Sequence, residues 1–184
     1  MESMKLNNNT IKKTFFLLLG LVVGSTLALP SVSHAGSRIN LLGIAEYALP
    51  RTGTRSAGVG GGASFEIGFG SAPVAFDIGA FFVQRGFGTT STSTLHAPAF
   101  LRFNFAKDIV SLGLGFFFDY YPSSRGYDYG PNSSLQFRIP MGSMLSFVLD
   151  GRFGVGLASF GTGSFYTMYV QGLAGLSFRL GAKK

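Results

Sequence analysis

The chain has 184 residues, of which 46% are hydrophobic and only 12% are charged, about half the charged fraction of roughly 25% that is usual in soluble domains. Its 27 glycines and 20 phenylalanines favour apolar β-structure over a disordered segment, and the absence of cysteine excludes disulfides, thiol catalysis, cysteine-bound metals and a lipoprotein anchor. The formal net charge is +7, but the basic residues are too few and too scattered to indicate a nucleic-acid-binding protein.

The first 35 residues are predicted to be a cleavable signal peptide. Three lysines form a positively charged start, residues 15–29 form an apolar run of 15 residues, and Ser33 and Ala35 occupy the small-residue positions of a cleavage site. An uncleaved membrane anchor is the weaker alternative, because a spanning helix needs about 18 or more apolar residues. We expect cleavage after Ala35, which leaves residues 36–184 as the exported domain.

Residues 36–184 divide into eight apolar-rich segments that are separated by turn-forming residues. Most of these segments are longer than the roughly 5–6 residues typical of strands in globular sheets. Their length suits a tilted strand that crosses a bilayer, which needs about 9–11 residues. We predict strands over residues 39–49, 59–69, 74–86, 95–105, 109–121, 133–140, 144–157 and 165–180.

The predicted connections alternate in length. The short turns GSAP, AKD and MGS follow the second, fourth and sixth segments, whereas longer polar or glycine-rich loops follow the first, third, fifth and seventh. An up-and-down antiparallel meander produces this alternation, and in outer-membrane barrels the short turns face the periplasm. An even number of strands would place both chain ends on the short-turn side.

Each predicted strand has one apolar face and one face of polar, charged or very small residues. In the stretch SLGLGFFFDYYP, Leu114, Phe116 and Phe118 share one face, whereas Gly113 and Asp119 share the other. An eight-stranded barrel encloses only enough space for its own side chains, so a lumen filled with phenylalanine and leucine would be overpacked. We therefore predict an inside-out barrel, with apolar side chains facing lipid and small or charged side chains facing the lumen.

The predicted lumen face carries five acidic and five basic residues. Buried charges persist only when they are paired and hydrogen-bonded, so we predict an ion-pair network that fills the lumen in place of an open channel. The alternative is that some of these side chains lie in water at the rims, where Arg85 and Arg179 are the first candidates. The predicted network consists of Glu46, Glu66, Asp77, Asp119, Asp150, Arg85, Arg102, Arg138, Arg152 and Arg179.

On these features the chain resembles the small eight-stranded outer-membrane β-barrel proteins of Gram-negative bacteria, the OmpA/OmpX type. The resemblance covers residues 36 to about 180 and rests on architecture, since no individual motif is specific. It implies an all-β, antiparallel, up-and-down transmembrane barrel in the bacterial outer membrane. It also implies a monomer that contacts outer-membrane lipid and lipopolysaccharide.

Three features depart from this family pattern. The chain continues past Phe178, whereas such barrels often end on an aromatic residue. Pro98 falls within a predicted strand, where we expect it near the outer rim or at a bulge. Tryptophan is absent, so the girdle at the membrane interface is expected to consist of Tyr47, Tyr120, Tyr121, Tyr166 and Tyr169.

No catalytic, cofactor or metal site is predicted. Asp77, Asp119 and Asp150 could form an acid–base pair or a cation site, but each has a candidate arginine partner, which favours structural pairing. His96 is the one histidine after residue 35. Because no serine motif accompanies it, as a hydrolytic triad would require, we expect a rim histidine beside the Thr/Ser-rich loop.

The predicted outer loops carry Arg51, Arg55 and Arg125. Arginine binds phosphate in a bidentate geometry, so these side chains are candidates for contact with lipopolysaccharide, with ordinary solvated loops as the alternative. We predict a non-enzymatic protein with a role in envelope integrity or surface contact. A narrow pore, a lipid-modifying enzyme and a soluble ligand-binding barrel of lipocalin type are the alternatives, since a barrel fold does not determine function.

Overall fold

The computed structural model describes residues 36–50, 55–69, 72–87, 90–160 and 166–180, so the predicted signal peptide lies outside the described residues. No helix within these ranges is long and apolar enough to span a membrane. A helical turn, η1 (Ala106–Asp108), connects two of the strands. The strands are β1 (Arg38–Pro50), β2 (Ser56–Gly68), β3 (Val74–Phe87), β4 (Thr90–Phe105), β5 (Val110–Tyr121), β6 (Gly126–Pro140), β7 (Leu145–Gly154), β8 (Ala158–Phe160) and β9 (Tyr166–Arg179).

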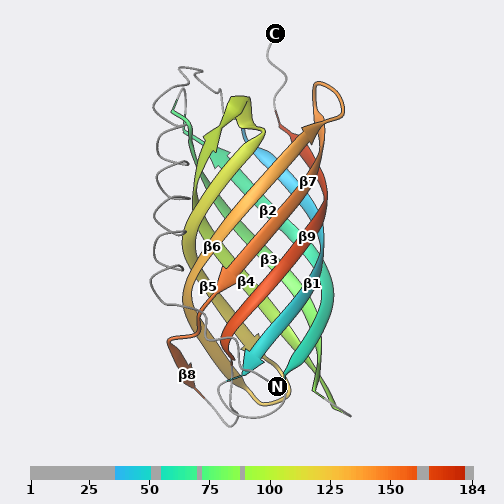
Figure 1. Ribbon diagram of the computed structural model, residues 1–184, viewed down its shortest axis with the longest axis vertical. Coiled ribbons are helices and arrows are strands. Elements are labelled where there is room, and N and C mark those ends of the chain that lie inside the picture. The colour runs from blue at the N-terminus through green and yellow to red at the C-terminus, as the bar shows by residue number, and fades with distance from the viewer. Residues whose placement is uncertain (1–35, 51–54, 70–71, 88–89, 161–165, 181–184) are drawn as a thin grey trace, which may run out of the picture. The chain divides into compact units, whose positions relative to one another are not determined.

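Eight of these strands close into an antiparallel barrel, as Figure 1 shows. Their hydrogen-bonded order is β5-β4-β3-β2-β1-β9-β7-β6, and β6 pairs with β5 to complete the ring. The three-residue strand β8 pairs with the start of β6 and stands apart from the ring. The predicted eight-stranded up-and-down barrel is therefore confirmed.

The register between strands fixes their tilt. Cα partners followed from Arg38 on β1 through each neighbouring strand return to β1 at Ala48, ten residues further along. Eight strands with this stagger tilt by roughly 40° from the barrel axis and enclose a radius of roughly 8 Å. The interior is therefore just wide enough for the side chains that point into it.

Inward-facing and outward-facing residues alternate along the strands, as the two-residue period predicts. On β5, Phe116 and Phe118 are exposed, whereas Phe117 and Asp119 are buried. The barrel is thus apolar outside and polar inside, the reverse of a soluble barrel. The exposed outer side chains include Leu41, Val59, Phe82, Leu114, Leu135, Ile139, Phe153 and Val170.

The strands extend further than the sequence suggests at one end of the barrel. β4 begins at Thr90 and β6 at Gly126, because the polar residues there continue the alternation, with Thr94 buried and Tyr129 exposed. The predicted alternation of short and long connections is therefore wrong. Connections 51–55, 88–89 and 122–125 are as short as turns, whereas 155–165 is longer and contains β8.

The barrel has two ends, which we call the short-turn end and the loop end. The short-turn end carries segments 69–73, 106–109 and 141–144, together with the start of β1 and the end of β9. The loop end carries segments 51–55, 88–89, 122–125 and the longer segment 155–165.

Pro98 lies in the middle of β4, so the prediction of a rim or bulge position is wrong. The pairing with β3 is interrupted at Ala97 and Pro98, but the register is the same on both sides. Gly79 on the partner strand β3 leaves space for the proline ring. A Cβ at this position would lie 3.3 Å from Cγ of Pro98 and 2.5 Å from the ring of Phe81. The proline ring is thus accommodated within the barrel wall where the facing strand presents a glycine.

Two tyrosines that were predicted for the interfacial girdle face the lumen instead. Tyr121 and Tyr169 are each 1% exposed, because the alternation along β5 and β9 places both side chains inside. Tyr47 is exposed and Tyr120 is partly exposed, as a girdle requires. The side chain of Tyr166 lies outside the described residues.

Glycines on the lumen face allow neighbouring strands to approach closely. A Cβ at Gly175 would lie 2.0 Å from the carbonyl oxygen of Leu41, whereas one at Gly172, on the outer face of the same strand, would meet no atom of another strand within 4 Å. Gly175→Ala is expected to lower the free energy of unfolding by about 1–3 kcal/mol, and Gly172→Ala to leave it unchanged. Urea-induced unfolding in detergent micelles measures both, and equal stabilities would contradict the close strand contact.

Candidate functional site

All the carboxylate side chains after residue 35 lie in the lumen. The sequence contains eight acidic residues, of which one, Glu2, precedes residue 36. The other seven are at most 5% exposed. The side-chain charge of residues 36–184 that remains outside the lumen is therefore entirely cationic. The buried acidic residues are Glu46, Glu66, Asp77, Asp108, Asp119, Asp128 and Asp150.

The residues predicted for the lumen network lie inside the barrel, with one at its mouth. Arg179 is 39% exposed at the short-turn end, and the other nine are buried. Arg85, for which a rim position was the alternative, is completely buried, since its guanidinium is enclosed by acidic and hydroxyl partners.

Three further charged residues are buried in the barrel and were not among the predicted lumen residues. Arg38 was placed before the first strand and Asp128 in a loop, although continued alternation on β1 and β6 would have located both inside. Asp108 carries no such signal, because it lies in the turn η1 with a φ of 70°. The lumen is thus more acidic than the predicted balance of five and five.

The short-turn cluster consists of Arg38, Glu66, Asp108 and Arg138. Arg38 donates from Nη2 to Asp108 over 2.8 Å and from Nη1 to Glu66 over 3.3 Å. Arg138 donates to the second oxygen of Glu66. Arg179 lies at the margin of the cluster, with Nη2 3.4 Å from the Asp108 carboxylate. Glu66 therefore bridges two arginines from β1 and β6 across the lumen.

The central cluster consists of Asp77, Arg102, Ser134, Asp150 and Arg152. Arg102 donates to Asp77 over 2.7 Å, to Asp150 over 3.1 Å and to the hydroxyl of Ser134 over 2.9 Å. Asp150 also accepts from Arg152 over 2.9 Å and from Ser134 over 2.7 Å. Two arginines and two aspartates from three strands, joined by Ser134 of a fourth, thus form a connected, charge-balanced group.

The loop-end cluster is built around Arg85. Arg85 donates to both carboxylate oxygens of Glu46, the longer bond being 2.9 Å, and to Asp119 over 3.0 Å. It also reaches the hydroxyls of Thr94 at 2.9 Å and Tyr121 at 3.3 Å. One guanidinium therefore ties β3 to β1, β4 and β5.

His96 belongs to the loop-end cluster, so the prediction of a rim histidine is wrong. It is 0% exposed, because it shares a strand face with Arg102, and its Nδ1 lies 2.6 Å from Asp119. Its Nε2 has no hydrogen-bond partner among the described residues. In a hydrolytic triad the nucleophile is hydrogen-bonded to this second ring nitrogen, and no nucleophile of the described residues takes that place. The described ranges also contain no group of three or more His, Cys, Asp or Glu side chains suited to a metal ion.

Aromatic rings fill the lumen between the central and loop-end clusters. The guanidinium of Arg152 lies over the rings of Phe81 and Phe100, at 5.1 and 5.2 Å from their centroids. Phe117 and Tyr169 pack edge to face with centroids 4.9 Å apart. Such cation–π and aromatic contacts hold the side chains of this section in place.

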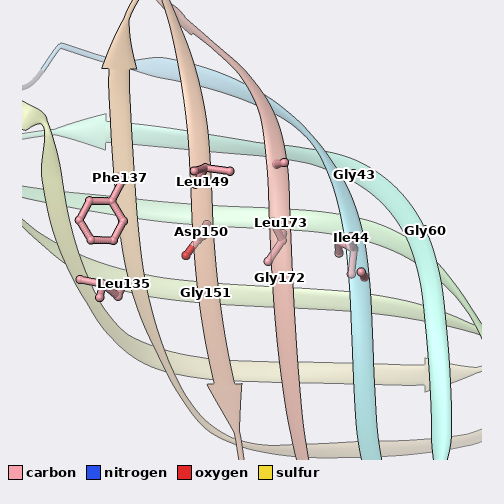
Figure 2. A pocket seen from close by; sticks show the side chains of 12 residues that line it. Gly43, Ile44, Gly60, Leu135, Phe137, Leu149, Asp150, Gly151, Gly172 and Leu173 are labelled. Carbon is pink, nitrogen blue, oxygen red and sulfur yellow. The ribbon is translucent and has the colours of Figure 1, made fainter.

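The outer surface carries an apolar groove across β1, β7 and β9, with a volume of about 650 Å³ (Figure 2). Gly43, Gly151 and Gly172 line it, and Leu135 and Phe137 of β6 stand beside them. These outward residues are small or apolar, so the groove suits a hydrocarbon chain. Its charged lining residue, Asp150, has a buried side chain that is paired with Arg102 and Arg152.

The arginines predicted for lipopolysaccharide contact lie at the loop end as far as the structure describes them. Arg55 precedes β2 and Arg125 precedes β6, and both are exposed. Arg125 adopts a φ of 52°, which places it in a tight turn. Arg51 lies outside the described residues.

No protein-family model matches the chain, and no curated protein matches it either. Solved structures resemble it in fold. For the crystal structure of Neisserial surface protein A the identity is 10%, the coverage 79% of this chain and 98% of that chain, and the TM-score 0.51. For outer membrane protein AlkL, solved by solid-state NMR in lipid bilayers, the identity is 11%, the coverage 85% and 96%, and the TM-score 0.47.

The likeness to Neisserial surface protein A shows a shared fold and nothing finer, because the identity is low. Together with the closed ring of eight strands and its apolar outer face, it establishes the fold of a small transmembrane β-barrel. Membership of the OmpA/OmpX type stays a prediction.

Proposed function

We propose that this chain is a monomeric, non-enzymatic barrel of the bacterial outer membrane with a structural role in the envelope. The observation that carries the proposal is the partition of side chains, with large apolar groups outside and all seven carboxylates after residue 35 buried. A barrel surface of this kind suits lipid contact. By analogy with such barrels, the short-turn end and both ends of the domain would face the periplasm.

The packed lumen supports a barrel that does not conduct ions. Wild-type protein in planar bilayers is expected to give no discrete conductance steps, because ion pairs and aromatic rings occupy its interior. The double variant Phe81→Ala/Phe100→Ala removes two rings beside Arg152 and is expected to conduct, which provides the opened control. Regular conductance steps from the wild-type protein would contradict the proposal.

A narrow pore is the second candidate, and one observation favours it. Nε2 of His96, the hydroxyl of Tyr169 and both Nη atoms of Arg152 are buried without a hydrogen-bond partner among the described residues. Buried polar groups are normally satisfied by protein or by ordered water, so these atoms indicate water within the lumen. If the protein is a narrow pore, the wild-type protein is expected to give discrete conductance steps in planar bilayers. The closed barrel is expected to give none.

The environment of His96 supports the absence of lipid-modifying activity. Its ring is enclosed by Phe117 and Tyr169, with centroid distances of 6.0 and 5.5 Å, and is hydrogen-bonded to Asp119. A lipid substrate on the outer surface would have to cross the barrel wall to reach it.

The loop-end arginines are proposed to contact the phosphates of lipopolysaccharide. Arg55 and Arg125 are exposed, and no carboxylate outside the lumen competes for them. Each basic residue near an anionic lipid surface contributes about 1 kcal/mol. The double variant Arg55→Gln/Arg125→Gln is therefore expected to weaken binding to immobilised lipopolysaccharide by roughly 30-fold. Met141→Gln changes an exposed residue at the opposite end of the barrel and is the control, and equal losses in both would rule out a loop-end contact.

A further inference from the structure

We propose that the short-turn end of the barrel binds an oxyanion, a phosphate or carboxylate group, in a polar cavity of about 220 Å³. The cavity lies within the mouth of the barrel, next to the short-turn cluster. Its charged lining consists of Arg38, Lys107, Asp108, Arg138 and Arg179. This site lies at the other end of the barrel from the proposed lipopolysaccharide contacts and does not depend on them.

This mouth of the barrel carries more cationic than acidic side chains. Arg38, Lys107, Arg138 and Arg179 line the cavity with Asp108, and Glu66 lies behind it as the second carboxylate. The buried arginines Arg38 and Arg138 are paired with these two carboxylates, so the excess comes from Lys107, which is exposed, and Arg179, which is 39% exposed and shares Asp108 with Arg38. A cleft with an excess of one sign of charge attracts ions of the other sign, so these two cations favour an anion in the cavity.

Two buried polar atoms beside the cavity lack hydrogen-bond partners among the described residues. They are the hydroxyl of Ser177 and Nε of Arg138, and each residue is 2% exposed. Both residues line the cavity, and both atoms can donate a hydrogen bond. A buried donor left without an acceptor is rare in folded proteins, and an oxyanion supplies several acceptors at once.

The shape of the cavity also suits an oxyanion. Guanidinium groups bind phosphate and carboxylate in a bidentate geometry, and Arg179 has one long contact of 3.4 Å to Asp108 and remains 39% exposed at the entrance. Because a water molecule takes roughly 30 Å³ of liquid volume, the cavity has room for one small oxyanion with a few waters. The geometry therefore fits a small anionic group that enters from the short-turn side.

The test is a titration of the full chain, purified in zwitterionic detergent, with inorganic phosphate and separately with acetate. Ionic strength is held constant with chloride, and the amide resonances of Gly142, Ser146 and Ser177 are followed by NMR. Saturable shifts of these resonances are expected with at least one of the two anions, and the comparison between them identifies the preferred group. Arg179→Gln is expected to weaken binding roughly tenfold, and Ser177→Ala to weaken it severalfold.

Ser123→Ala, at the loop end, is the matched control for Ser177→Ala and is expected to bind as the wild type does. Arg179 is partly exposed and Ser123 is exposed, so neither variant should prevent folding, which the heat-dependent gel shift of the barrel verifies. Three outcomes would overturn the proposal: shifts that do not saturate with either anion, wild-type affinity in both Arg179→Gln and Ser177→Ala, or an equal loss in Ser123→Ala.

Discussion

Replacing Arg102 by leucine is expected to lower the free energy of unfolding by about 3–5 kcal/mol, the cost of removing one partner of a buried ion pair. The guanidinium is 0% exposed and binds Asp77 and Asp150 at once. In the variant Asp150 keeps Arg152, whereas Arg102 is the one side chain that donates to Asp77 within the described ranges. The leucine therefore leaves a buried carboxylate without a cation.

Urea-induced unfolding in lipid vesicles measures this effect. The double variant Arg102→Leu/Asp77→Asn is expected to be more stable than Arg102→Leu alone, because it also removes the buried carboxylate that Arg102→Leu leaves without a cation. Leu101→Val changes the neighbouring side chain on the outer face and is expected to cost about 1 kcal/mol or less. A loss from Arg102→Leu no greater than that from Leu101→Val would show that the central cluster does not stabilise the barrel.

Replacing Asp119 by leucine is expected to lower the free energy of unfolding by about 2–3 kcal/mol, less than Arg102→Leu, because Arg85 retains Glu46. The substitution removes the partner of His96 and one of two carboxylate partners of Arg85.

Phe118→Leu changes the preceding residue, which is exposed and stacks on Tyr127 with ring centroids 5.7 Å apart. Phe118→Leu is expected to cost about 1 kcal/mol or less, since it exchanges one apolar outward side chain for another. The two variants test the two faces of one strand, and the same unfolding measurement serves for both. If Phe118→Leu were the more damaging change, the assignment of Asp119 to the lumen and Phe118 to lipid would be reversed.

The fold could be predicted from the sequence because the two-residue period is strong wherever apolar and small residues alternate. Phe116 and Gly113 on β5 illustrate the signal, since bulky outward groups cannot fit an eight-stranded lumen. Strand ends were less predictable. Thr90 and Gly126 begin strands within stretches rich in turn-forming residues, where pairing with a neighbouring strand overrides local preference.

The candidate site was predictable only where a charged residue fell inside a recognised strand. Alternation located Asp77 and Arg102 but not Asp128, which lay in a stretch read as a loop. Asp108 enters the lumen from a turn, and no periodic pattern marks such a residue. Which acid pairs with which arginine depends on the strand register, and the shift of ten residues around the barrel becomes known only when the ring is closed.

The central claim is that this chain forms a closed barrel in the bacterial outer membrane, with its apolar face in lipid. Membrane fractionation followed by gel electrophoresis with and without boiling tests it most directly. We predict that the protein is found in the outer-membrane fraction and that the unboiled, folded form migrates differently from the boiled form. A protein recovered in the soluble fraction, with the same migration before and after boiling, would contradict the account.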